Sequence, residues 1–60
     1  MKAERYAGKK VRIILKNNFH YTGLILEASE NKILIKDKFD NEVLISLDEV
    51  LVMECVQNGN

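Results

Sequence analysis

The sequence predicts a small all-β protein, a five-stranded and strongly bent antiparallel barrel preceded by a short helical turn. Three observations carry this prediction. The chain has only 60 residues and contains no Pro or Trp. Apolar, often β-branched residues alternate with polar ones along most of it, which is the period of a strand. Short polar turns divide the alternating runs, as in small barrels. We expect the barrel at 9–56, an N-terminal segment at 1–8 and a disordered tail at 57–60.

The beginning of the chain predicts a helical turn and the first strand. Residues 1–8 favour a short turn of helix, which Gly8 ends. Residues 11–16 then alternate, with the odd-numbered side chains on the apolar face. The pair Asn17-Asn18 follows, and Asn tolerates the positive φ that tight hairpin turns need. The first two strands are therefore expected to form a hairpin.

The middle of the chain predicts two more strands. Residues 19–27 alternate again, with Gly23 at the centre, where a glycine usually marks a bulge or a sharp bend at a barrel corner. Residues 28–31 are a short polar turn. Residues 32–36 form a third strand with both isoleucines inward, and residues 37–41 have the composition of a turn.

The last two predicted strands, 42–47 and 50–56, are joined by a brief break at 48–49 and have a different pattern. Val43–Ile45 and Val50–Met53 are unbroken apolar runs, which implies burial on both faces. A barrel of this size has no second layer, so we expect another subunit to cover these strands. The alternative is that the N-terminal segment folds over them. The expected interface residues are Val43, Leu44, Ile45, Leu51, Val52 and Met53.

Length and composition narrow the class of protein further. A chain of 60 residues buries only roughly 60% of its unfolded surface, so a solitary core is marginal. One Cys and one His provide neither an intrachain disulfide nor a four-ligand zinc site. Self-association is therefore the remaining way to add stability to so small a core. Cys55 is expected to be a small buried or interface thiol. We expect no cofactor, no membrane segment and a cytoplasmic location.

The formal net charge of zero hides an uneven distribution. Residues 1–22 carry six Lys and Arg against one Glu, whereas residues 23–60 carry three Lys against eight acids. Charge asymmetry between halves indicates either a nucleic-acid partner or complementary subunit surfaces. Composition alone does not choose between these two.

The first third of the barrel resembles the first motif of the Sm-like (LSm) family. That motif reads roughly G-K-x-V-x-V-x-L-K-N-G-x-x-Y-x-G, and residues 8–23 follow it with Asn18 in place of the usual glycine. The short fourth loop also resembles the bacterial Hfq branch. The matching residues are Gly8, Lys9, Val11, Ile13, Leu15, Lys16, Asn17, Tyr21 and Gly23.

This resemblance implies a fold, an assembly and a ligand. Sm-like proteins are five-stranded bent barrels that form rings of six or seven subunits, in which the fourth strand of one subunit pairs with the fifth of its neighbour. Such a head-to-tail interface closes by rotation. The implied partners are therefore copies of the chain in a hexameric or heptameric ring, and single-stranded RNA.

Two loops depart from the family pattern. The third loop, usually D-x-x-M-N, is shorter here: counting back from the following strand places Lys32 at the Asn position and Asn31 at the Met position, while counting forward from the first motif places Ser29 at the Asp position. The second motif, usually I-R-G-x-x-I, falls on residues 45–50, where Ser46 and a leucine replace Arg and Gly. The loss of that Arg removes a base contact of the family.

The candidate RNA-binding residues are therefore Ser29, Asn31, Lys32, Ser46 and His20. An amide can bond a base edge and a lysine can neutralise a phosphate; equally, Asn31 supplies a turn and Lys32 a solvated strand end. His20 could stack on a base, although an exposed strand histidine is the simpler interpretation. No pattern indicates catalysis.

These features favour a ring-forming Sm-like protein that binds single-stranded RNA, as a scaffold or chaperone in RNA metabolism. The main alternative is a structural or protein-interaction oligomer with the same barrel and no standard RNA pocket. A third class, a monomeric SH3-like adaptor, explains the strands but not the doubly apolar fourth and fifth ones.

Overall fold

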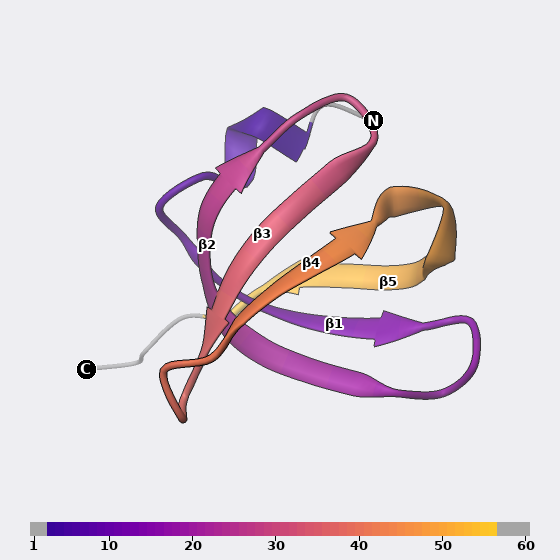
Figure 1. Ribbon diagram of the computed structural model, residues 1–60. Coiled ribbons are helices and arrows are strands. Elements are labelled where there is room, and N and C mark those ends of the chain that lie inside the picture. Colours follow the sequence, from indigo (N-terminus) through magenta and orange to yellow (C-terminus); the bar gives the residue numbers. More distant parts are fainter. Residues whose placement is uncertain (1–2, 57–60) are drawn as a thin grey trace.

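The fold is all-β, with five antiparallel strands in one strongly bent, barrel-like sheet (Figure 1). The computed structural model describes residues 3–56. Within them lie the 3-10 turn η1 (Ala3–Tyr6), β1 (Lys10–Leu15), β2 (His20–Ala28), β3 (Lys32–Asp37), β4 (Glu42–Ser46), the 3-10 turn η2 (Leu47–Glu49) and β5 (Val50–Cys55). The predicted fold class is confirmed; the tail predicted at 57–60 lies outside the described residues.

The strand order is β4-β3-β2-β1-β5, so the fourth and fifth strands are the two edges of the sheet. Every hydrogen-bonded pair of neighbours in this order is antiparallel. The third and fourth strands pair over Lys32–Lys36 and Glu42–Ser46, and β5 returns to pair with β1 at the other side. Consequently the two doubly apolar strands each leave one backbone edge without a partner in the described chain.

The bend of the sheet is concentrated in β2, which changes partners along its length. Its first half pairs with β1 and its second half with β3. Gly23 and Leu24 have register partners in both strands, and Ile25, opposite Ile35, also exchanges backbone hydrogen bonds with Gly8 and Lys9 just before β1. Figure 1 shows the strand curving from one partner to the other. The bulge lies at Leu26, which is skipped in the register with β3, rather than at Gly23. Gly23 is needed for another reason: a Cβ at this position would lie 2.3 Å from the Lys36 carbonyl oxygen, so only glycine allows β2 and β3 to approach this closely.

The core consists of the inward-facing residues that the alternation predicts. Its members are nearly or fully inaccessible and come from β1, β2, β3 and β4, and Tyr6 of η1 and Tyr21 pack at the margin. The six core residues are Val11, Ile13, Ile25, Ile33, Ile35 and Ile45. All six are β-branched, which suits the pleated surface of a sheet.

The turns use the chemistry expected of their residues. Asn18 has φ 73° and Gly8 has φ 81°, so both predicted turn positions adopt the left-handed region. In the turn between β3 and β4, Asp40 has φ 70°, and the Oδ1 atom of Asp37 accepts hydrogen bonds from two backbone amides of the turn. The prediction that Leu47 continues the fourth strand is wrong; it begins η2 instead and remains half-buried against the core.

Candidate functional site

The β2–β3 turn and the end of β4 lie side by side. The backbone N–H of Leu47 donates to the carbonyl oxygen of Asn31 at 2.9 Å, and Lys32 stands opposite Ser46 in the register. Pairing of β3 with β4 thus brings Asn31, Lys32 and Ser46 together, although fourteen positions of the sequence separate the last two. The sequence predicts these residues as candidates from two separate loops, and the structure joins them.

Ser29 shapes this turn from within. Its Oγ accepts a hydrogen bond from the backbone N–H of Lys32 at 3.2 Å, and the hydroxyl lies within donating distance of the Lys32 carbonyl and of Oδ1 of Asn31. Its backbone N–H also donates to the carbonyl of Lys32 at 2.8 Å. Ser29 therefore has a structural role in closing the turn and engages Oδ1 of Asn31, which leaves the amide NH2 group of Asn31 and the exposed side chain of Lys32 to meet a ligand.

The chemistry available here is modest and polar. Lys32 offers a flexible cation, Asn31 an amide, and Ser46 a half-buried hydroxyl. The exposed carboxylates of Asp48 and Glu49 follow directly in η2. One lysine followed by two acids gives this end of the sheet no surplus of positive charge, so directed hydrogen bonds are its main means of contact.

His20 does not join this group. It begins β2, whereas the Ser29–Lys32 turn follows the other end of the same strand. Its neighbours are Tyr21, Thr22 and the turn after β3, with Lys38 and Phe39. The five RNA-binding candidates therefore fall into two places, four around the β2–β3 turn and one at the opposite end of the sheet.

The predicted interface residues divide into two groups by burial. Val43, Ile45 and Met53 pack on the core of their own chain, whereas Leu44, Leu51 and Val52 are 64%, 63% and 41% exposed. Two consecutive apolar residues are exposed on β5 because Leu51 is skipped in the register with β1. The exposed group is the part of the prediction that can meet another chain.

The described part of the N-terminal segment does not cover this apolar group. Its η1 turn packs against β2, and the leucines at both sheet edges remain open. Cys55 is likewise exposed, so the expectation of a thiol buried within the chain is wrong; a position at an interface stays a prediction.

Sequence reasoning missed a second polar surface. Lys36, Lys38 and Phe39 were not candidates, yet Lys36 and Lys38 line the same groove as Lys9 and Lys10, and Phe39 lines a second hollow together with Lys38. The sequence contained a signal, because Lys36, Lys38 and Phe39 lie within four consecutive positions at the end of β3 and in the turn after it. Its meaning depended on which strands become neighbours.

Comparison of the chain with protein-family models and with curated proteins gives no match. Within residues 3–56, no helix is long and apolar enough to cross a membrane. The same residues contain no group of three His, Cys, Asp or Glu side chains placed to hold a metal ion.

Proposed function

We propose that the protein is an Sm-like, ring-forming protein that binds single-stranded RNA, as a scaffold or chaperone in RNA metabolism. The observation that carries the proposal is the strand order. It places the two strands that are apolar on both faces at the two free edges of the sheet, and pairing of those edges between copies is the assembly that the resemblance implies.

The side chains at these edges support association. Leu44 on β4 and the Leu51–Val52 pair on β5 expose apolar surface that no described residue of the chain covers. Pairing β4 of one copy with β5 of the next would satisfy backbone groups and bury these side chains in one step. A chain as short as this one gains more from such burial than a larger domain would.

The first experiment measures the mass of the purified protein in solution by light scattering. We expect six or seven times the chain mass of 6.9 kDa. Leu51→Gln at the edge should lower that mass, whereas Leu24→Gln, which removes a partly exposed leucine from the central strand β2, should not. A wild-type protein that stays monomeric at micromolar concentration would rule out the ring.

The RNA part of the proposal relies on the β2–β3 turn. Ring closure would repeat Asn31, Lys32 and Ser46 in every subunit, so that several weak contacts engage one strand together. An amide donor and a cation at each repeat suit a base edge and a phosphate.

The second experiment titrates labelled oligouridine and oligoadenine against the oligomer by fluorescence anisotropy. Asn31→Ala and Lys32→Ala should each weaken binding. Lys32→Ala should also make the log–log salt slope shallower, by about 0.7 for each phosphate that the variant no longer neutralises. Lys16→Ala removes an exposed lysine after β1 and serves as the matched control.

One observation favours a second candidate function, a structural or protein-interaction oligomer without an RNA site. Ser46 and Leu47 stand where the family has Arg and Gly, and Asp48 and Glu49 are exposed beside them, where they repel phosphate. An oligomer of ring mass that binds neither oligonucleotide at low salt would select this function over the first.

A further inference from the structure

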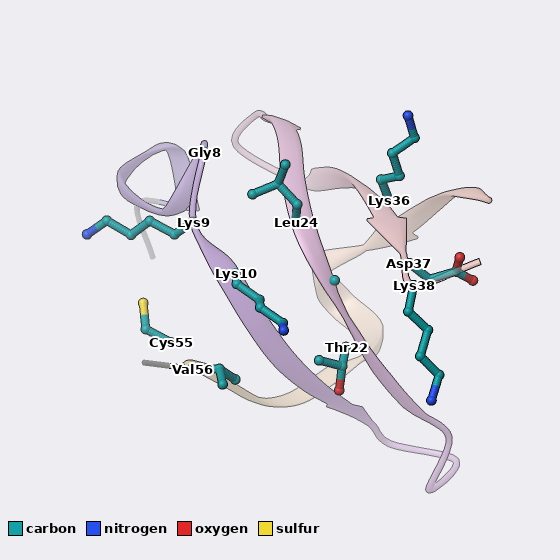
Figure 2. A pocket seen from close by; sticks show the side chains of 11 residues that line it. Gly8, Lys9, Lys10, Thr22, Leu24, Lys36, Asp37, Lys38, Cys55 and Val56 are labelled. Carbon is teal, nitrogen blue, oxygen red and sulfur yellow. The ribbon is translucent and has the colours of Figure 1, made fainter. Parts of the chain in front are cut away.

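A groove crosses the outer face of the sheet between β1, β2 and β3 (Figure 2). Lys10, Leu24 and Lys36 stand directly opposite one another on these strands, so they form one row on that face. Lys9 and Lys38 also line the groove. Figure 2 shows the Lys10 side chain crossing the middle and those of Lys36 and Lys38 projecting at the β3 margin. We call Lys9, Lys10, Lys36 and Lys38 the groove lysines.

The groove carries a surplus of positive charge in a chain whose net charge is zero. Four lysines line it against one carboxylate, that of Asp37. The Oδ1 atom of Asp37 already accepts hydrogen bonds from the backbone N–H groups of Phe39 and Asn41, at 2.9 and 3.0 Å. Lys36 forms an ion pair with the largely exposed Asp40, at 3.6 Å, and stands opposite the exposed Glu42 in the register with β4; surface pairs of this kind are weak. Within residues 3–56 the other three groove lysines form no ion pair.

An exposed aromatic residue adjoins this charge. A second hollow, lined by His20 and Phe39, shares Thr22, Asp37 and Lys38 with the groove, so the two form one continuous surface. Phe39 is 73% exposed at the tip of its turn, and Nζ of Lys38 lies 5.5 Å from the centre of its ring. A phenylalanine this exposed adds little to the core; the Lys38 ammonium lies over one face of its ring, and most of the residue's surface remains accessible to a ligand.

We propose that this surface binds a single-stranded nucleic acid, with phosphates on the groove lysines and a base stacked on Phe39. A basic groove beside an exposed aromatic ring is the combination that recognises single strands, because phosphates need only charge and every base has a flat face. A run of acidic residues would use the lysines but has no flat group to stack on the ring, so the aromatic residue favours a nucleic acid over a purely acidic segment.

The surface is separate from the β2–β3 turn. Lys32 begins β3 and Lys38 follows its end, so these two lysines lie about 20 Å apart along the strand, and Lys36, the groove lysine of β3 nearest to Lys32, lies about 13 Å from it, at roughly 3.3 Å per residue. This inference shares its class of ligand with the proposed function but none of the residues of the β2–β3 turn site, whereas His20, the fifth RNA-binding candidate, lines the hollow beside Phe39. It does not require a ring. One strand bound at both sites would run from the outer face of a subunit toward its β2–β3 turn.

The test measures binding of labelled oligouridine and oligoadenine by fluorescence anisotropy over a range of salt concentrations. The double variant Lys10→Gln with Lys38→Gln should make the log–log salt slope shallower by about 0.7 for each phosphate that is no longer neutralised, whereas Lys16→Gln should leave the slope unchanged. Phe39→Ala should weaken binding roughly fivefold or more, and Phe39→Tyr, which keeps the ring, should restore it. Circular dichroism of each variant confirms that the sheet is intact.

The outcomes separate the two proposals. Loss of binding in the lysine double variant with normal binding in Asn31→Ala and Lys32→Ala supports the groove and removes the turn site. The reverse result overturns the groove and keeps the turn site. Equal loss in the double variant and in Lys16→Gln, or an unchanged affinity for Phe39→Ala, contradicts the groove. Competition by poly-glutamate as strong as that by RNA of equal charge would assign the surface to an acidic protein instead, and absence of any RNA binding overturns both proposals.

Discussion

The central strands and the edge strands of this sheet use their apolar residues differently. In β1, β2 and β3, the inward isoleucine and valine residues are almost fully inaccessible, and the outward side chains are exposed or half-buried, with Leu24 and Leu26 of β2 42% and 36% exposed. In β4 and β5, apolar side chains lie on both faces, and Leu44 and Leu51 remain open to solvent. The central strands therefore bury most of the core within one chain, whereas each edge strand combines a more exposed leucine with a backbone edge that has no partner in residues 3–56.

The largest expected loss of stability comes from truncating a core residue of a central strand. Ile35→Ala removes a fully buried side chain from β3 and should cost about 2–5 kcal/mol of unfolding free energy. A domain of this size has only about 3–9 kcal/mol in total, so the variant should be largely unfolded or close to it. Urea unfolding followed by far-ultraviolet circular dichroism measures this loss.

The matched edge variant is Leu44→Ala, which truncates a 64% exposed residue. It should change the stability of a single chain by less than about 1 kcal/mol. Its unfolding midpoint should instead depend on protein concentration differently from wild type, because association stabilises folded chains by mass action. Equal losses for Ile35→Ala and Leu44→Ala at every concentration would show that the two regions do not differ.

A second, smaller effect concerns the bend of β2. Gly23→Ala would place a Cβ 2.3 Å from the Lys36 carbonyl oxygen and 2.9 Å from its carbon, so the backbone of β3 must shift. We expect a loss of about 1–3 kcal/mol, as for other additions to a close-packed site. Thermal unfolding measures the loss, and a variant as stable as wild type would mean that β2 and β3 can separate here without cost.

A third effect, of about 1 kcal/mol, follows from Gly8. Its φ of 81° suits glycine, but a Cβ there would meet no atom within 4 Å. Gly8→Ala should therefore lose stability through backbone strain alone, and Gly8→Asn should lose less because Asn tolerates this conformation. Urea midpoints of the two variants give the comparison; equal midpoints would argue against strain as the cause.

The smallest effect tests how β5 is attached to the central strands. Arg12 of β1 pairs with Glu54 of β5, with Nε 2.8 Å from Oε1, and both side chains are about half exposed. A double-mutant cycle with Arg12→Ala and Glu54→Ala should give a coupling energy below about 1 kcal/mol. A larger coupling would mean that β5 depends on this ion pair as well as on its backbone hydrogen bonds with β1.

Much of the fold could be predicted from local sequence, because alternation and turn residues act over only a few positions. The alternation marked the buried residues of β1 to β4, and Asn18 and Gly8 predicted the left-handed positions. The interruptions were harder to predict. The bulges at Leu26 and Leu51 arise from the register between strands, which no single strand contains.

The candidate sites show the same division. Asn31, Lys32 and Ser46 could be named from their loops, but their proximity depends on the pairing of β3 with β4. Lys9 and Lys10 could be grouped with each other but not with Lys36 and Lys38, because the first pair belongs to the basic half of the sequence and the second pair to the acidic half. Counting charges separately in the two halves of the sequence therefore does not predict where positive charge gathers on the folded surface.

The sequence by itself determined that this chain forms five strands with one β-branched core, and that its last two strands are apolar on both sides. These properties depend on residue type and on a two-residue period. Only the tertiary structure decided that those two strands are the free edges, that position 23 has no room for a Cβ beside the Lys36 carbonyl, and that four lysines line one groove. Each of these depends on which strands become neighbours and in what register. Strand order and register are set by contacts among all five strands, so no single segment of the sequence determines them.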